Sequence, residues 1–131
     1  MDGGLTDLSK YRLETAKEDL RTAKNNYAEG SYRASLNRSY YSIFHALRAI
    51  TALDRFDSRK HSGIIAYINQ FYVKTGTFDR AFSKMIDSSF RLREKADYED
   101  FYIVAIADAK RQIENAESVI AIVENYVQTR W

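Results

Sequence analysis

The absence of proline from all 131 residues constrains the fold of this chain more than any other feature of its sequence. A helix interior tolerates proline least, because proline lacks a backbone N–H and clashes with the preceding turn. The chain has only five glycines, so it has few residues suited to tight turns. The composition therefore favours long helices and an all-α fold.

The apolar residues recur every three or four positions, which predicts five helices separated by short breaks. The helices are expected over about residues 7–29, 32–53, 62–73 and 78–96, and after residue 100. Gly30 and Gly76 are expected to end the first and third helices, and Ser31 and Thr77 to cap the second and fourth. Asp97 and Tyr98 are expected to cap the fifth helix and anchor its turn. Short connections favour antiparallel neighbours, so the prediction is an antiparallel bundle of four to five helices in a single domain over residues 1–131.

Each predicted helix has one apolar face that should point into the bundle. In the third helix these inward residues are Ile64, Ile65, Ile68, Phe71 and Tyr72. In the fifth they are Ile106, Ala109, Ile113, Ala116, Ile120, Val123 and Val127. The fifth helix has the most regular pattern in the chain.

Charge and composition exclude several classes of protein. The formal net charge of +2 is too small for a dedicated duplex-DNA binder. The lack of cysteine excludes disulfides and thiolate sites, and two histidines without cysteine make a metal site unexpected. No signal peptide and no apolar run long enough to span a membrane is evident, so we expect a cytoplasmic protein without a cofactor.

The second predicted helix carries an arginine and a histidine on one side. In Arg38-Ser-Tyr-Tyr-Ser-Ile-Phe-His45 the two residues are seven positions apart, about two helical turns. They lie almost opposite the core stripe of this helix, on a face that is small, aromatic and low in charge. Such a face is usually covered, either by another helix of the bundle or by a second copy of the chain. An arginine and a histidine on one stripe can bind a phosphate and transfer a proton beside it.

Four segments in order resemble the HEPN family (higher eukaryotes and prokaryotes nucleotide-binding domain). They are Arg38-Ser-Tyr-Tyr-Ser-Ile-Phe-His45-Ala, Lys60-His61-Ser62-Gly63-Ile64-Ile65, Phe71-Tyr72-Val73-Lys74-Thr75-Gly76 and Arg93-Glu94-Lys95-Ala96-Asp97-Tyr98. The resemblance covers about residues 8–127. It implies a helical bundle that forms a homodimer.

The resemblance also implies an activity. Many HEPN proteins are metal-independent endoribonucleases whose Arg-x4-6-His motif meets its twin across the dimer, and Arg38 and His45 match that motif as Arg-x6-His. Arg38 would hold the scissile phosphate and His45 would act in proton transfer during attack by the ribose 2′-hydroxyl. The family further implies a toxin whose antitoxin partner is a minimal nucleotidyltransferase.

The sequence departs from the family pattern at two positions. Active HEPN ribonucleases often have Asn, Asp or His directly after the arginine, where this chain has Ser39. In one toxin branch a tyrosine two residues beyond the histidine receives adenylate groups, and this chain has Leu47 there. Regulation by adenylation of that position is therefore not implied.

Three further residues are candidates for binding RNA or a nucleotide. Lys60 and His61 stand at a predicted helix start, where free backbone N–H groups suit an anion, although a solvated polar end is the alternative. Tyr41 is a candidate for stacking on a base, whereas Tyr40 falls on the core stripe. Arg91 and Arg93, near the end of the fourth predicted helix, are expected to add positive charge to a groove, although cations near a helix C-terminus are also common because of the helix dipole.

Two functional hypotheses follow. The first is a ribonuclease dimer that uses Arg38 and His45. The second is a non-catalytic module that binds a nucleotide or docks against a nucleotidyltransferase. In the second hypothesis the pair is structural, with Arg38 bonded to a carboxylate and His45 to a backbone or tyrosine group.

Overall fold

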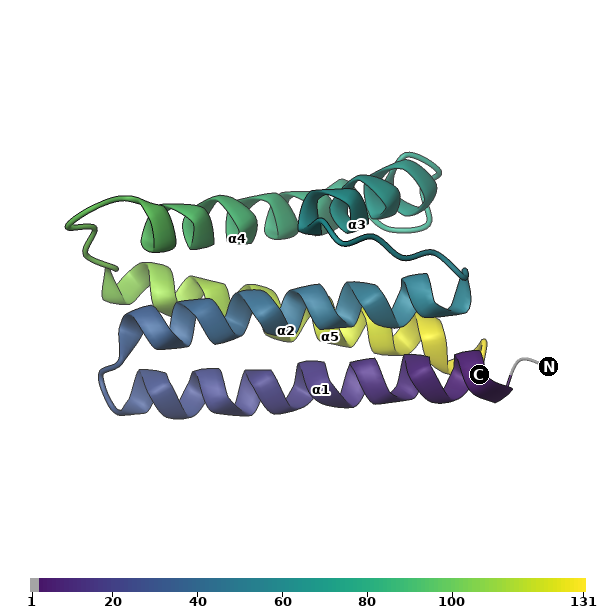
Figure 1. Ribbon diagram of the computed structural model, residues 1–131, viewed down its shortest axis with the longest axis horizontal. Helices are drawn as coiled ribbons and strands as arrows, with labels where there is room; N and C mark the ends of the chain where they lie inside the picture. The colour runs from purple at the N-terminus through teal and green to yellow at the C-terminus, as the bar shows by residue number, and fades with distance from the viewer. Residues whose placement is uncertain (1–2) are drawn as a thin grey trace.

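The computed structural model describes residues 3–131, and over this range the fold is all-α without strands. Its elements are α1 (Gly3–Ala28), α2 (Tyr32–Leu53), α3 (His61–Ile68), the short π-helix η1 (Asn69–Val73), α4 (Arg80–Tyr98) and α5 (Ile106–Gln128). Consecutive helices run antiparallel except for α2 and α3, which run in the same direction because the connection between them returns along α2 (Figure 1). His61 at the start of α3 therefore contacts Tyr40 in the middle of α2, and Tyr67 near the end of α3 contacts Asp54 at the end of α2. The helices α1, α2 and α5 are grouped together, and α3 and α4 lie along the other side of α2 (Figure 1). The predicted all-α bundle is confirmed.

The second helix is the centre of the bundle. α2 packs against α1, α5, α4 and α3, and most of its residues are buried. The largest fully buried side chains of the core include Tyr40, Phe82, Leu36, Ile43, Leu47 and Ile50, five of them from α2. No helix within the described range is both long and apolar enough to cross a membrane.

Small residues line the contact between α1 and α2. Three α1 residues spaced by seven face three α2 residues spaced by seven, in antiparallel order: Ser9 with Ala49, Ala16 with Ser42, and Ala23 with Ser35. In each pair a serine hydroxyl donates to the backbone carbonyl of the facing alanine, at 2.7–2.8 Å. All six residues are fully buried. We call them the serine–alanine seam. It shows that α1 covers part of the second face of α2 within one chain.

The third predicted helix has the expected extent but not the expected geometry. After Ile68 the chain continues as η1, where the backbone N–H of Lys74 donates to the carbonyl of Asn69, an i→i+5 bond of 2.9 Å. The wider turn rotates the side chains relative to a regular α-helix. Tyr72 is therefore buried, whereas Phe71 is 50 % exposed, so the prediction that Phe71 faces inward is wrong.

The start of the fourth helix differs from the prediction because the chain turns inward before it. Phe78 is buried, and its backbone N–H donates to the carbonyl of Tyr72 at 2.8 Å. The helix therefore begins after Phe78, and Asp79 is its cap, accepting a hydrogen bond from the N–H of Ala81 at 3.0 Å. The prediction that Thr77 caps this helix is wrong. Ser31 does stand at the cap position of α2, but its side chain makes no capping hydrogen bond.

The break between the last two helices comes later than predicted. α4 continues through Tyr98, and Asp97 forms an i,i+4 ion pair of 2.9 Å with Arg93 on its last turns. Tyr98 is 73 % exposed and does not anchor a turn, and Ala105 stands at the cap position of α5. Ile106 is also exposed, while the other predicted inward residues of α5 are buried. The expected roles of Asp97 and Tyr98 at α5 are therefore wrong.

Candidate active site

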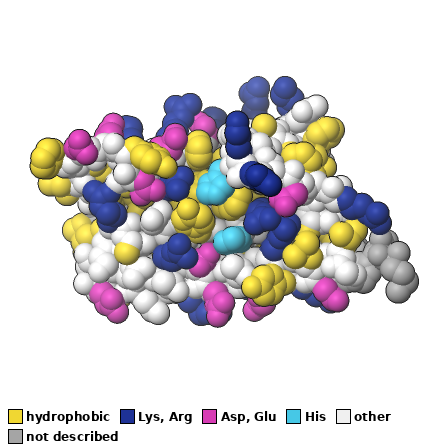
Figure 2. Space-filling model, viewed as in Figure 1, with side chains coloured by type: hydrophobic (Ala, Val, Ile, Leu, Met, Phe, Trp, Pro, Cys, Tyr) yellow, Lys and Arg dark blue, Asp and Glu magenta, His cyan; other side chains and the backbone are white. Residues whose placement is uncertain are grey.

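Four polar or aromatic side chains form a half-buried line along α2. Arg38, Tyr41, His45 and Arg48 follow one another at intervals of three, four and three residues, so they share one side of the helix. Figure 2 shows the two histidines of the chain near the middle of one face of the molecule, with Arg and Lys side chains around them. We call the surface that carries these four side chains and both histidines the histidine face. It lies between α1 on one side and α3 and α4 on the other.

The helix α1 contributes a carboxylate that lies between the two motif residues. Arg38 Nη1 donates to Asp19 Oδ1 at 3.1 Å, and His45 Nε2 lies 3.7 Å from Asp19 Oδ2. The second distance is too long for a hydrogen bond, and Oδ2 has no hydrogen-bond partner within the described residues. The side chains of Arg38 and His45 remain 41 % and 26 % exposed, whereas that of Asp19 is 14 % exposed. One mostly buried carboxylate thus holds Arg38 by a hydrogen bond and faces His45, and part of each motif side chain stays open to solvent.

Burial is the main influence on the charge of His45. Desolvation lowers its pKa below the ordinary value, and the positive charges of Arg48, Arg38 and Arg12 lower it further, while Asp19 acts in the opposite direction. The imidazole is therefore neutral at neutral pH. A neutral imidazole is the form that accepts a proton.

His61 is placed on the same face by the first turn of α3. Its Nδ1 lies 2.7 Å from the hydroxyl of Tyr40, and its ring centroid lies 4.0 Å from that of Phe44. Burial lowers the pKa of His61, and the charges of Arg93, His45 and Arg48 lower it further. The sequence predicted His61 as a binding residue at a helix start. His61 is indeed the first residue of α3, and the structure also places it beside the aromatic side chains of α2, on the face that carries His45.

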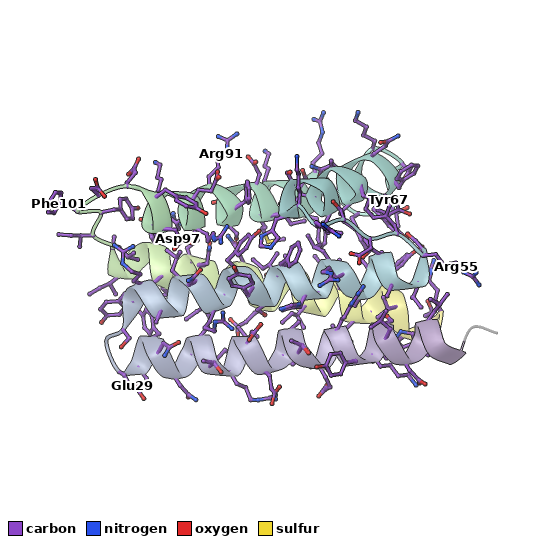
Figure 3. All side chains as sticks on the ribbon, in the orientation of Figure 1. Glu29, Arg55, Tyr67, Arg91, Asp97 and Phe101 are labelled. Atoms are coloured by element: carbon purple, nitrogen blue, oxygen red, sulfur yellow. The ribbon has the colours of Figure 1, made fainter. Side chains whose placement is uncertain are left out.

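Tyr41 lies between two arginines. The guanidinium carbon of Arg38 is 5.0 Å from the Tyr41 ring centroid, and Arg93 Nη2 donates to the Tyr41 hydroxyl at 3.2 Å. Both contacts orient the ring, and arginine over an aromatic face is a favourable pair. Arg93 thus adds positive charge to the histidine face, whereas Arg91, the other arginine of this prediction, pairs with Asp87 and is exposed. In Figure 3, Asp97, the ion-pair partner of Arg93, lies between α4 and α2, whereas Arg91 points outward.

Lys60 stands at the cap position of α3, directly before His61. It is exposed, and its backbone N–H donates to Ser58 Oγ at 3.2 Å. It is thus an exposed residue adjacent in sequence to His61 of the histidine face. Ser39, the residue directly after Arg38, does not lie on the histidine face. It is fully buried, and its hydroxyl makes no hydrogen bond within residues 3–131.

Two residues of α1 that the sequence analysis did not select complete the site. Asp19 contacts both motif residues, and Arg12 donates from Nη1 to the backbone carbonyl of Arg48 at 3.2 Å. The position of Asp19 in the sequence does indicate that it lies near the contact of α1 with another helix. It lies between Ala16 and Ala23, two alanines of the inward stripe of α1, so a charge there borders the helix contact.

Comparison with known proteins agrees with this fold. A family model described as HEPN domain matches residues 9–126. A protein of Methanocaldococcus jannaschii named "Putative toxin MJ0605" is 32 % identical over 115 residues, which cover 88 % of this chain and 80 % of that protein. A second protein of that organism, named "Putative toxin MJ0142", is 28 % identical over 87 residues, 66 % of this chain and 59 % of that protein.

A Thermotoga maritima protein named "UPF0332 protein" is 27 % identical over 119 residues, 91 % of this chain and 90 % of that protein. Because the family model covers most of the sequence, and because the structure is the expected helical bundle, the chain belongs to the HEPN domain family.

Proposed function

We propose that this protein is a metal-independent endoribonuclease of the HEPN type that uses Arg38 and His45. The observation that carries the proposal is the shared contact of these two residues with Asp19, which holds them side by side and half-exposed on the histidine face. The three cationic side chains of Arg48, Arg12 and Arg93 surround them, and such a surface attracts the phosphates of a single strand.

The geometry supports a role for each side chain. Arg38 uses one N–H group on Asp19, and the remaining N–H groups of its exposed guanidinium are donors for a phosphate oxygen. Asp19 lies on the Nε2 side of His45, so Nδ1 is the nitrogen available to take the proton of the ribose 2′-hydroxyl. The 2′-oxygen then attacks phosphorus, and the bond to the 5′-oxygen breaks. This leaves a 2′,3′-cyclic phosphate and a 5′-hydroxyl end.

The active form in this proposal is a homodimer. The line of Arg38, Tyr41 and His45 is half-buried along an open side of α2, and a two-fold contact along this line would bring two copies of the motif together. Light scattering at micromolar protein concentration tests this part. A mass of one chain under the conditions in which RNA is cleaved would contradict the shared site.

The biological role that fits this activity is that of a toxin with a minimal nucleotidyltransferase as antitoxin. Support comes from the family and from two relatives whose names describe toxins. Co-expression with a nucleotidyltransferase encoded beside this chain, followed by co-purification and loss of RNA cleavage, tests the partnership.

A second candidate function is a non-catalytic module that binds a nucleotide or docks against the nucleotidyltransferase. It is favoured by two observations: Asp19 already satisfies Arg38 within the chain, and Ser39 is buried away from the histidine face. In that case the Arg38–Asp19–His45 group is a structural polar contact. Its removal would then lower stability without any effect on RNA.

The experiment that separates the two candidates measures cleavage of single-stranded RNA in the presence of a chelator. We expect Arg38→Ala and His45→Ala each to lower the rate by about 10²–10⁴-fold, the usual contribution of one positioned phosphate donor or proton-transfer group. The matched control is Arg91→Ala, since Arg91 is exposed and pairs with Asp87 on the outer side of α4. Circular dichroism confirms that each variant is folded. Equal cleavage by wild type and both motif variants would attribute the signal to a contaminating nuclease.

A further inference from the structure

Cleavage of RNA by this route needs two proton transfers, and in the proposed dimer the candidates for the second one are the partner's His45 and His61 on the histidine face (Figure 2). One group must take the proton of the 2′-hydroxyl, and another must give a proton to the departing 5′-oxygen. Resting on the proposed endoribonuclease function, we propose that His61 is the general acid that protonates the 5′-oxygen, while His45 of the same protomer is the general base.

The first argument is position. His45 and His61 come from different helices, α2 and α3, yet both rings lie beside the same aromatic residues. The Phe44 ring centroid is 6.0 Å from that of His45 and 4.0 Å from that of His61. Tyr41 lies between them in the same way, at 6.4 Å from His45 and 5.8 Å from His61. The two imidazoles therefore flank one small patch of surface, as an acid and a base on either side of one phosphodiester would.

The second argument is the orientation of the His61 ring. Tyr40 is 1 % exposed, and burial raises the pKa of its phenol, so the hydroxyl keeps its proton. The contact of 2.7 Å with Nδ1 then fixes the ring and engages that nitrogen. Nε2 is left as the nitrogen that meets a ligand. A buried tyrosine held against one ring nitrogen aims the other, as the carboxylate of a catalytic triad does for its histidine.

The third argument is charge. The groups around His61 are Tyr40, Tyr41, His45 and Arg48 of α2 and Arg93 of α4, and the charged ones among them are cationic. The three arginines Arg38, Arg48 and Arg93 are paired with Asp19, Asp57 and Asp97. A phosphate bound among them adds negative charge beside His61 and favours its protonated form. His61 is thus protonated when the RNA is bound, which is when the reaction needs its proton.

The proposed step is balanced without a further reactant. His45 accepts the proton of the 2′-hydroxyl as the 2′-oxygen forms its bond to phosphorus. The electron pair of the breaking bond between phosphorus and the 5′-oxygen goes to that oxygen, which takes the proton from His61 Nε2. The enzyme then holds a protonated His45 and a neutral His61, and exchange with water restores the starting state.

The test uses the full chain, single-turnover conditions and RNA in which sulfur replaces the bridging 5′-oxygen at the cleaved bond. A thiolate leaves without protonation, since thiols are far more acidic than alcohols. The variant is His61→Gln, whose amide can still hydrogen-bond to Tyr40, and its melting temperature shows that it is folded. We expect His61→Gln to lower cleavage of ordinary RNA by about 10²–10⁴-fold and to cleave the sulfur-substituted RNA at nearly the wild-type rate. His45→Gln should stay slow on both substrates.

The outcomes separate the two proposals. If the wild type does not cleave RNA, the proposed endoribonuclease function fails and the role of His61 fails with it. If Arg38→Ala and His45→Ala are inactive but His61→Gln cleaves ordinary RNA at the wild-type rate, or is equally slow on both substrates, only the role of His61 is overturned.

Mixing two inactive variants tests whether the pair belongs to one protomer. A mixture of His45→Gln and His61→Gln chains, unfolded and refolded together, contains dimers in which every protomer lacks one of the two groups. We expect this mixture to remain inactive. Recovered activity would show that His45 of one protomer works with His61 of its partner, which contradicts the proposal.

Discussion

At the scale of single residues, one carboxylate of α1 balances the charges of the histidine face. Within residues 3–131, Asp19 is the one acid among the groups that act electrostatically on His45, whose other charged neighbours are Arg48, Arg38 and Arg12. Its negative charge therefore limits how far the pKa of His45 falls below the ordinary value. The same side chain holds Arg38 through a hydrogen bond of 3.1 Å.

Replacement of Asp19 by asparagine should change the titration of His45 in a defined direction. Without the carboxylate, the three arginines and burial act unopposed, so the pKa of His45 should fall further. Histidine ring resonances followed by NMR during a pH titration measure this change. Glu18→Gln is the matched control, because Glu18 is the exposed neighbour of Asp19 on α1. A His45 pKa that stays constant or rises in Asp19→Asn would contradict the assigned contact.

The sequence identified part of this site. The Arg38 and His45 spacing and the start of the third helix selected both histidines, because the residue types carry the chemistry. Asp19 and Arg12 were not selected, since on their own helix they look like ordinary surface charges. Their contacts with α2 depend on how α1 rotates against it.

At the scale of elements, the serine–alanine seam determines how α1 meets α2. Small side chains at seven-residue intervals let the two backbones approach, and the serine hydroxyls bond across to carbonyls of the facing helix. This seam fixes the rotation of α1 that places Asp19 beside Arg38 and His45. The stability of the helix pair and the geometry of the site thus depend on the same contact.

Substitutions at Ser42 should reveal this dependence. Ser42→Ala loses one hydrogen bond to Ala16 and should lower the free energy of unfolding by about 1 kcal/mol. Ser42→Leu must force the helices apart and should cost about 1–3 kcal/mol or more. Urea unfolding followed by circular dichroism measures both. Ala34→Leu, at an exposed position of α2, is the control. A Ser42→Leu protein as stable as wild type would show that the helices do not pack through this seam.

Helix boundaries show where pattern reading works for elements and where it fails. The long helices were predicted well, and Gly30 ends the first with a positive φ of 81° as expected. The cap of α4 and the register of η1 were not predicted correctly, because both follow from tertiary contacts. Phe78 turns inward to reach the core, and the π-turn after Ile68 lets Tyr72 do the same.

At the scale of the whole molecule, the two histidines link folding to pH. Burial lowers the pKa of both His45 and His61 below the ordinary value of 6.5. As the pH falls below that value, the unfolded chain binds protons before the folded one does. The free energy of unfolding should therefore decrease, and this loss is complete once the pH is below the folded-state pKa values.

A variant without histidine should show a weaker dependence. His45→Gln combined with His61→Gln removes every imidazole from the chain. Urea unfolding between about pH 8 and about pH 5.5 measures the slope of stability against pH, above the range in which most carboxylates titrate. We expect the wild type to lose more stability than the double variant over this interval. Equal slopes would mean that neither histidine is held preferentially in its neutral form.

The sequence by itself determined the fold class, the family and the residues able to transfer protons. The fold class follows from composition and apolar periodicity, the family from its resemblance to four motif segments, and the proton-transfer residues from side-chain chemistry, and all three are properties of the sequence alone. Only the tertiary structure decided that Asp19 lies between Arg38 and His45, and that Tyr40 holds His61 on the same face. These contacts join residues about 20 positions or more apart on different helices. Their geometry depends on the rotation of one helix against another, which close packing of the whole bundle determines.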